Sequence, residues 1–161
     1  MYWDWVSDAA APAKASVWDP ITGFGGNGVR TNDNGPRLRV VDGPFKDYRP
    51  RCWNSDEDPH WLSRDWIPAD PANGMPELVG NNYNATVVAE VNTNTVYDQF
   101  RDRLENGPHA AVHAGVAGGF LGLGDMGFQN ASPSGEFFFF FLSLSICLRF
   151  RNGMLTAYKN E

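Results

Sequence analysis

His109 and His113 are the two residues whose types and spacing most directly suggest chemistry. On a helix, side chains four positions apart lie on one face about 5–6 Å apart, so that both imidazoles can reach one metal ion. A helix is expected here, because Pro108 suits a first helical turn and Gly118 followed by another glycine would end it. Such pairs also arise as structural accidents or caps, so spacing alone leaves both interpretations open.

A zinc hydrolase is one alternative for this histidine pair. Zinc metalloproteases place a glutamate directly after the first histidine as general base, whereas that position here holds Ala110. Elsewhere in the chain no Ser/His/Asp order, P-loop or closely paired carboxylates stands out. The missing glutamate argues against a zinc hydrolase, and we assign no catalytic residue.

Two further motifs resemble binding sites but lack the required context. Residues 23–28 match GxGxxG, yet Trp18-Asp19-Pro20 before them cannot be a buried strand, and the polar segment 30–36 after them cannot open a helix. We predict a glycine turn rather than a dinucleotide site. His60 lies in a turn at 58–61, where a local hydrogen bond is a better expectation than metal binding.

Composition excludes several classes of function. The 161-residue chain has 13 Lys+Arg against 19 Asp+Glu, a formal net charge of −6, and no basic stretch. This balance argues against nucleic acid or an anionic membrane as the main partner. Two cysteines, Cys52 and Cys147, cannot build a disulfide framework or a cysteine-rich metal site. With 3 histidines in total, any site needing more imidazoles is excluded within this chain.

The elements that must position the histidines are predicted to be helices. Residues 8–76 are rich in Pro, Gly and Trp without a sustained period, which predicts a long irregular segment held by buried aromatic side chains. Val96, Phe100 and Leu104 then recur every four residues and predict a helix from about Thr95 to Asn106, with Thr95 and Asp98 as a capping box. A second helix is expected over 108–118.

Several spaced elements together resemble the tyrosinase family, the dinuclear type-3 copper phenol oxidases, and especially its fungal members. They occur in family order from Tyr2 to Ser134: Tyr2-Trp3-Asp4-Trp5, Val17-Trp18-Asp19-Pro20, the glycine loop at 23–28, the segment 104–113 with both histidines, Gly118-Gly119, Gly124-Asp125-Met126 and Ala131-Ser132-Pro133.

The resemblance implies a fold, a cofactor and a substrate class. The fold would be mainly α, part of the tyrosinase-type copper-binding helical bundle with long irregular loops. His109 and His113 correspond to the first two ligands of the second copper, CuB. In the family, two coppers per site bind dioxygen and oxidise phenols or catechols to quinones, so a phenolic small molecule would be the substrate.

The chain departs from the family pattern at the copper ligands. The three ligands of the first copper, CuA, belong to helices that precede the Tyr2-Trp3 element, and the third CuB ligand should follow Ser132-Pro133, where the chain reads Gly135-Glu136-Phe137. Ala110 stands where the family often has an asparagine that helps to deprotonate monophenols. Two of six expected ligands remain, so we expect this chain alone to be inactive; a non-catalytic product that binds one metal ion weakly, or acts through protein association, is the alternative.

The resemblance also divides the chain. Residues 1–134 would form a partial copper-binding domain, with a loop layer over 1–94, CuB-side helices over 95–118 and a loop over 119–134. Residues 135–161 form a non-homologous tail whose apolar run, 137–148, is too short to span a bilayer. Gly135-Glu136-Phe137 can be encoded with GTGAGT, the usual start of an intron, so we interpret this tail as translated intron.

Overall fold

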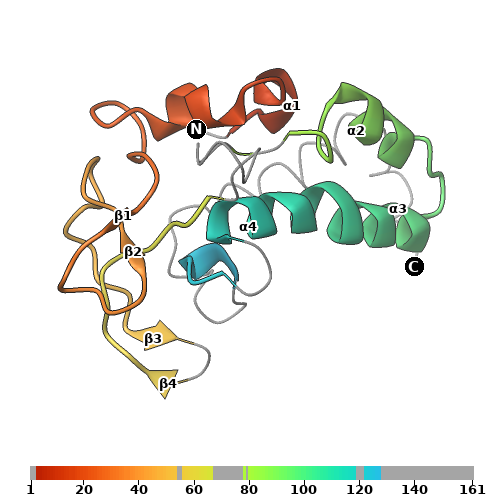
Figure 1. Ribbon diagram of the computed structural model, residues 1–161. Helices are drawn as coiled ribbons and strands as arrows, with labels where there is room; N and C mark the ends of the chain where they lie inside the picture. Colours follow the sequence, from red (N-terminus) through yellow and green to blue (C-terminus); the bar gives the residue numbers. More distant parts are fainter. Residues whose placement is uncertain (1–2, 54–55, 67–77, 79, 119–121, 128–161) are drawn as a thin grey trace, which may run out of the picture.

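Helices, rather than strands, make up most of the regular structure (Figure 1) in the computed structural model, which describes residues 3–53, 56–66, 78, 80–118 and 122–127. This confirms the expectation of a mainly helical chain. The α-helices are α1 (Trp5–Asp8), α2 (Ala85–Asn92), α3 (Tyr97–Leu104) and α4 (Ala110–Ala117). The 3-10 helices are η1 (Pro12–Lys14), η2 (Ser16–Trp18) and η4 (Asp125–Gly127).

The segment predicted to be irregular contains two small antiparallel hairpins. β1 (Val29–Arg30) pairs with β2 (Leu38–Arg39), and β3 (Cys52–Trp53) pairs with β4 (Asp56–Glu57). In the first hairpin Val29 lies opposite Arg39, and in the second Cys52 lies opposite Glu57. Strands of two residues are too short to show an alternating pattern, which is why the sequence did not predict them.

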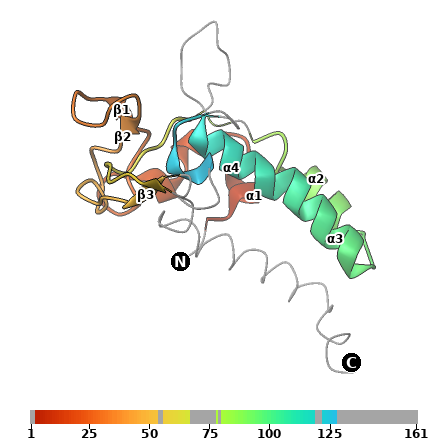
Figure 2. The same cartoon turned by 90° about the horizontal axis from the view of Figure 1, so that it is seen from below.

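We use the name helical arm for residues 85–118, which hold α2, α3 and α4. Figures 1 and 2 show α3 and α4 following one another along one line, with α2 beside α3. Between α3 and α4, the wide turn η3 (Glu105–His109) contains Gly107, whose φ of −111° and ψ of −109° are not helical. The predicted break between two helices is confirmed at this glycine.

Two local predictions for the arm were wrong. α3 begins at Tyr97 with Val96 as its N-cap and no side-chain cap, so the expected Thr95–Asp98 capping box does not form. α2 is a helix inside the range 1–94 that was expected to be loop. The signals that were missed are its N-cap, Asn84, and the spacing of its buried Val88 and Val91 on one face.

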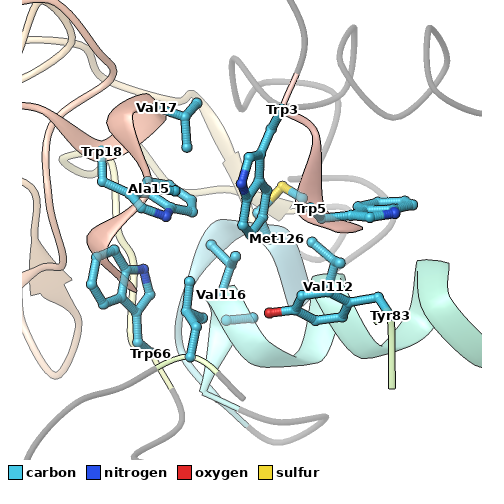
Figure 3. Packing of buried hydrophobic residues seen from close by; sticks show 12 residues of the cluster. Trp3, Trp5, Ala15, Val17, Trp18, Trp66, Tyr83, Val112, Val116 and Met126 are labelled. Carbon is cyan, nitrogen blue, oxygen red and sulfur yellow. The ribbon is translucent and has the colours of Figure 1, made fainter. Parts of the chain in front are cut away.

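Buried aromatic rings pack across α4 and form the main core (Figure 3). The Trp3 and Trp18 rings meet edge to face with centroids 5.2 Å apart, and Trp66 lies 5.1 Å from Trp18. From α4, Val112 and Val116 enter the same cluster. The predicted role of aromatic side chains in holding the irregular segment is confirmed for Trp18 and Trp66, and their burial is what places this segment over the helix that carries the histidines.

Among the described residues, no helix is long and apolar enough to cross a membrane. The apolar run 137–148, like the rest of the predicted tail, lies outside the described residues.

Candidate metal centre

A local feature of the backbone places His109 and His113 on adjacent turns. His109 ends the wide turn η3, and Pro108 within this turn has no N–H to donate to a carbonyl one turn back, which favours a widened turn at this point. α4 then runs regularly past His113 to its end at Gly118, which adopts the left-handed conformation with φ of 88°. A side chain at Gly118 would also collide with the backbone oxygen of Asp65.

The two imidazole rings lie face to face. Their centroids are 4.7 Å apart and their planes differ by 12°, and both side chains are half-buried. Burial, together with the neighbouring His113, lowers the pKa of His109 to about 4. Burial also lowers the pKa of His113, against the opposing effect of a backbone hydrogen bond. Both rings are therefore neutral at pH 7, which is the form that binds metals.

A hydrogen bond from His113 determines which of its ring nitrogens can act as a ligand. Nδ1 lies 2.7 Å from the carbonyl oxygen of Met126, in η4. Because a carbonyl oxygen only accepts, Nδ1 carries the hydrogen, and in the neutral ring Nε2 then carries the lone pair. Histidines that bind metals usually donate their other N–H in this way, since it fixes both tautomer and orientation.

The donor set fits copper in chemical type but is small. Neutral imidazole nitrogens suit copper, and the two rings are close enough to act together. Within the described ranges, no group of three or more His, Cys, Asp or Glu side chains comes together that could hold a metal ion. Residues 135–137, which replace the expected third ligand, lie outside these ranges. The structure thus brings together both predicted site residues, and their binding of a metal stays a prediction.

The loop at 23–28 is a glycine turn, as predicted. Its carbonyl groups surround a buried guanidinium: Arg64 donates to the carbonyl oxygens of Phe24, Gly25 and Gly26 at distances of 2.7–3.0 Å. A phosphate-binding loop does the opposite and directs N–H groups at an anion. Neither a preceding strand nor a following helix borders this loop, so it has the wrong chemistry and context for a dinucleotide.

His60 makes the predicted local hydrogen bond, with Nδ1 2.6 Å from the carbonyl oxygen of Asp58. Sequence reasoning missed its second contact, between Nε2 and Oδ1 of Asp125 at 2.7 Å. Asp125 belongs to one of the motifs that resemble tyrosinases, but 65 positions separate it from His60 and no periodic pattern connects them. The available signal was the motif Gly124-Asp125-Met126, in which a carboxylate lies between a glycine and an apolar residue.

Comparisons with known proteins show which sequences this chain is similar to. The common central domain of tyrosinase matches residues 1–141. The chain is 34% identical over 125 residues to tyrosinase-like protein phomQ2 of Diaporthe leptostromiformis, covering 76% of this chain and 31% of that protein. It is 34% identical over 134 residues to phomQ1 of the same fungus, covering 74% and 33%. Tyrosinase ustQ of Aspergillus flavus is 30% identical over 124 residues, covering 76% and 34%.

The chain spans about a third of the length of these relatives. The family match nevertheless covers most of the chain, and it includes the glycine turn, the aromatic core residues and the helix that carries both histidines. The chain therefore belongs to the tyrosinase family.

Proposed function

We propose that His109 and His113 are two ligands of the second copper in a dinuclear copper centre that oxidises phenols or catechols to quinones with dioxygen. The observation that carries this proposal is the pair of neutral, stacked imidazoles, one of which is anchored through Nδ1 to the Met126 carbonyl. Membership of the tyrosinase family supports copper as the metal and phenol oxidation as the class of reaction.

The residues of this chain hold and orient the metal rather than react with substrate. Copper, when bound, supplies the dioxygen binding and the electron transfer. His109 and His113 donate nitrogen lone pairs, and the Met126 carbonyl keeps the His113 proton on Nδ1. Ala110, directly after His109, has no group that accepts a proton from a monophenol, so we propose catechols as the preferred substrates.

By itself, this chain is proposed to be inactive. Six imidazoles hold the two coppers of the family, whereas the chain contains 3 histidines. Of these, His60 is committed to Asp58 and Asp125. The shortage of histidines also favours the second candidate function, a non-catalytic product that binds one metal ion weakly.

A copper titration tests the metal assignment. The 161-residue chain should bind copper weakly with 1:1 stoichiometry in competition with a chelator of known affinity, because two imidazoles do not complete a coordination shell. His113→Ala should abolish this binding, and so should the double variant His109→Ala/His113→Ala. Circular dichroism serves as the control for folding. Equal copper uptake by the wild type and the double variant would contradict the assignment.

A catechol oxidation assay tests the proposed inactivity. The copper-loaded chain should show no turnover above free copper. Turnover that disappears on chelation, returns on copper replenishment and requires His109 would contradict the proposal and point to a site shared between two chains.

Sequencing messenger RNA across the codon for Ser134 separates the two candidate functions. A spliced message that continues into Asp-Pro and a histidine pair would support a copper oxidase and the interpretation of residues 135–161 as intron. An abundant message that reads through to Glu161 as the only form would contradict the intron and favour the non-catalytic product.

A further inference from the structure

His60 and Asp125 form a buried pair that links the irregular segment to the turn beside α4. Nε2 of His60 lies 2.7 Å from Oδ1 of Asp125, and their side chains are 3% and 1% exposed. The pair is separate from the proposed copper ligands, and nothing in the proposed chemistry uses it.

The contacts of His60 require a charged ring. Nδ1 faces the Asp58 carbonyl oxygen and Nε2 faces the Asp125 carboxylate, so both nitrogens must carry a hydrogen for both contacts to be hydrogen bonds. The charge of Arg37, which pairs at 2.5 Å with the Asp58 carboxylate, also acts on this ring. Burial and Arg37 lower the pKa of His60, but the hydrogen bonds and the charge of Asp125 outweigh them and raise it.

Asp125 connects this pair to the proposed copper ligand. Its Oδ2 accepts from the backbone N–H of Ser63 at 2.8 Å, and its own N–H donates to the Ser63 carbonyl at 3.0 Å. The Ser63 hydroxyl donates to the Leu123 carbonyl at 3.1 Å. The residue after Asp125 is Met126, whose carbonyl accepts from Nδ1 of His113. One short turn thus contacts His60 on one side and His113 on the other.

We propose that His60 is a positioning residue for the metal site. In its charged form it holds Asp125, and through Asp125 it holds the Met126 carbonyl against Nδ1 of His113, which keeps Nε2 available as the ligand atom. This inference rests on the proposed function for the identity of the metal, but the positioning itself is a property of the metal-free chain.

The physical reason lies in the charge on Asp125. If His60 loses its proton, a carboxylate that is almost fully buried loses its positive partner. Such a carboxylate must draw in water or move, and either change disturbs the turn that carries the Met126 carbonyl. His113 can then adopt the other tautomer, in which Nε2 carries the hydrogen and cannot bind a metal.

Nitrogen NMR of the metal-free, 161-residue chain tests the proposal directly, because it distinguishes the two tautomers of His113. In the wild type, His113 should carry its hydrogen on Nδ1 while His60 is charged, and the other tautomer should appear as the pH rises through the raised pKa of His60. In His60→Gln, which cannot be charged, the other tautomer should be present throughout this pH range.

Asn34→Ala is the matched control. Asn34 is also buried, and its amide binds the backbone of Trp61, next to His60, but it does not titrate. It therefore loosens the same segment without removing the ion pair, and the His113 tautomer and its pH dependence should match the wild type. A tautomer change in this variant as large as that in His60→Gln would overturn the proposal, because general loosening would then explain both.

The pH dependence of copper affinity gives a second test, and we expect it to run in the opposite direction from that of an ordinary histidine site. Ligand histidines normally make affinity rise with pH, but burial lowers the pKa values of His109 and His113, so these rings lose their protons at lower pH than His60, whose pKa is raised. Deprotonation of His60 should therefore lower the affinity of the wild type as pH rises, by about tenfold, the effect typical of losing a group that orients a ligand. His60→Gln should lack this fall.

The outcomes separate this inference from the proposed function. A wild-type His113 tautomer that stays unchanged while His60 titrates would overturn the positioning role, whatever the copper result. Failure of the chain to bind copper, with the tautomer change present, would contradict the metal assignment alone. If His60→Gln does not fold, the wild-type titration with the Asn34→Ala control still decides the matter.

Discussion

The irregular segment, residues 8–76, of which the structure describes 8–53 and 56–66, and the helical arm each bury histidine, with opposite effects on its charge. In the irregular segment, His60 lies between the Asp58 carbonyl and the Asp125 carboxylate, and its pKa is raised. In the arm, at the junction between α3 and α4, burial and a second imidazole lower the pKa of His109 to about 4. Burial removes the charge of a histidine unless a carboxylate is buried with it. The charged ring can hold a neighbour in place, and the neutral rings can bind a metal.

The two regions also differ in what holds them together. Many contacts of the irregular segment are polar, as in the three carbonyl groups bound by Arg64 and the bond from the Gly26 N–H to Asp42. In the arm, α2 and α3 pack through a small apolar cluster of Val91, Phe100 and Leu104. Substitutions should therefore act through charge and hydrogen bonding in the first region, and through helix stability in the second.

The largest effect is expected for Asp125→Ala, which leaves His60 buried without its carboxylate. Removing one partner of a buried pair costs about 3–5 kcal/mol, so the free energy of unfolding in urea should fall by that amount. Asp33→Ala is the control, because Asp33 is an exposed carboxylate paired with Arg39. Similar losses of unfolding free energy in the two variants would show that the buried pair of His60 and Asp125 stabilises the fold no more than the exposed pair of Asp33 and Arg39.

Because the pKa values of His60 and His109 shift in opposite directions, the free energy of unfolding should pass through a maximum as the pH is varied. His60, with its raised pKa, contributes stability that is complete below about pH 6.5 and is lost as the pH rises through its folded-state pKa. His109, whose folded-state pKa is about 4, destabilises the fold as the pH falls below about 6.5, because the unfolded chain takes up the proton first.

The contribution of His60 can be tested at pH values above the stability maximum, and that of His109 at pH values below it. His60→Gln should flatten the alkaline side, and His109→Gln should flatten the acid side by about 1–2 kcal/mol after allowance for solvent screening of a half-buried ring. Urea unfolding at several pH values measures both. If either variant flattened the other side instead, the assignment of charge to the two regions would be reversed.

A smaller effect is expected from Asn84→Ala, which removes the N-cap of α2. The Asn84 side chain accepts from the Val87 N–H at 3.1 Å, and loss of such a cap costs about 1 kcal/mol. Hydrogen exchange should show the loss in α2, with the contact between His60 and Asp125 unchanged. Asn84→Ser, which keeps a capping oxygen, should recover most of the stability, and failure of this recovery would mean that the cap is not the cause.

The smallest effect is expected for Ile21→Ser in the irregular segment. Ile21 is 87% exposed, so its replacement removes no buried apolar contact. The free energy of unfolding should change by less than about 0.5 kcal/mol. A larger loss would show that apolar contacts at the surface also hold this segment, and would weaken its contrast with the arm.

Local patterns were sufficient to predict much of the arm and the candidate ligands. The four-residue recurrence of Phe100 and Leu104, Pro108 at a turn, and Gly118 at a helix end each act within a few residues, so the sequence carries their effects directly. The same holds for the glycine turn at 23–28, where neighbours alone ruled out a strand and a helix. By itself, the sequence determined a mainly helical chain, a break near Gly107 and two histidines on adjacent turns.

Only the tertiary structure decided how those histidines are supported. The Met126 carbonyl on His113, the Asp125 carboxylate on His60, and the rings of Trp18 and Trp66 against each other join residues that are far apart in the chain. No periodicity connects such residues, because their contacts depend on how loops close over α4. The protonation state of each histidine follows from those contacts, since burial and the nearest charged partner set the pKa, and neither is visible in the order of residues.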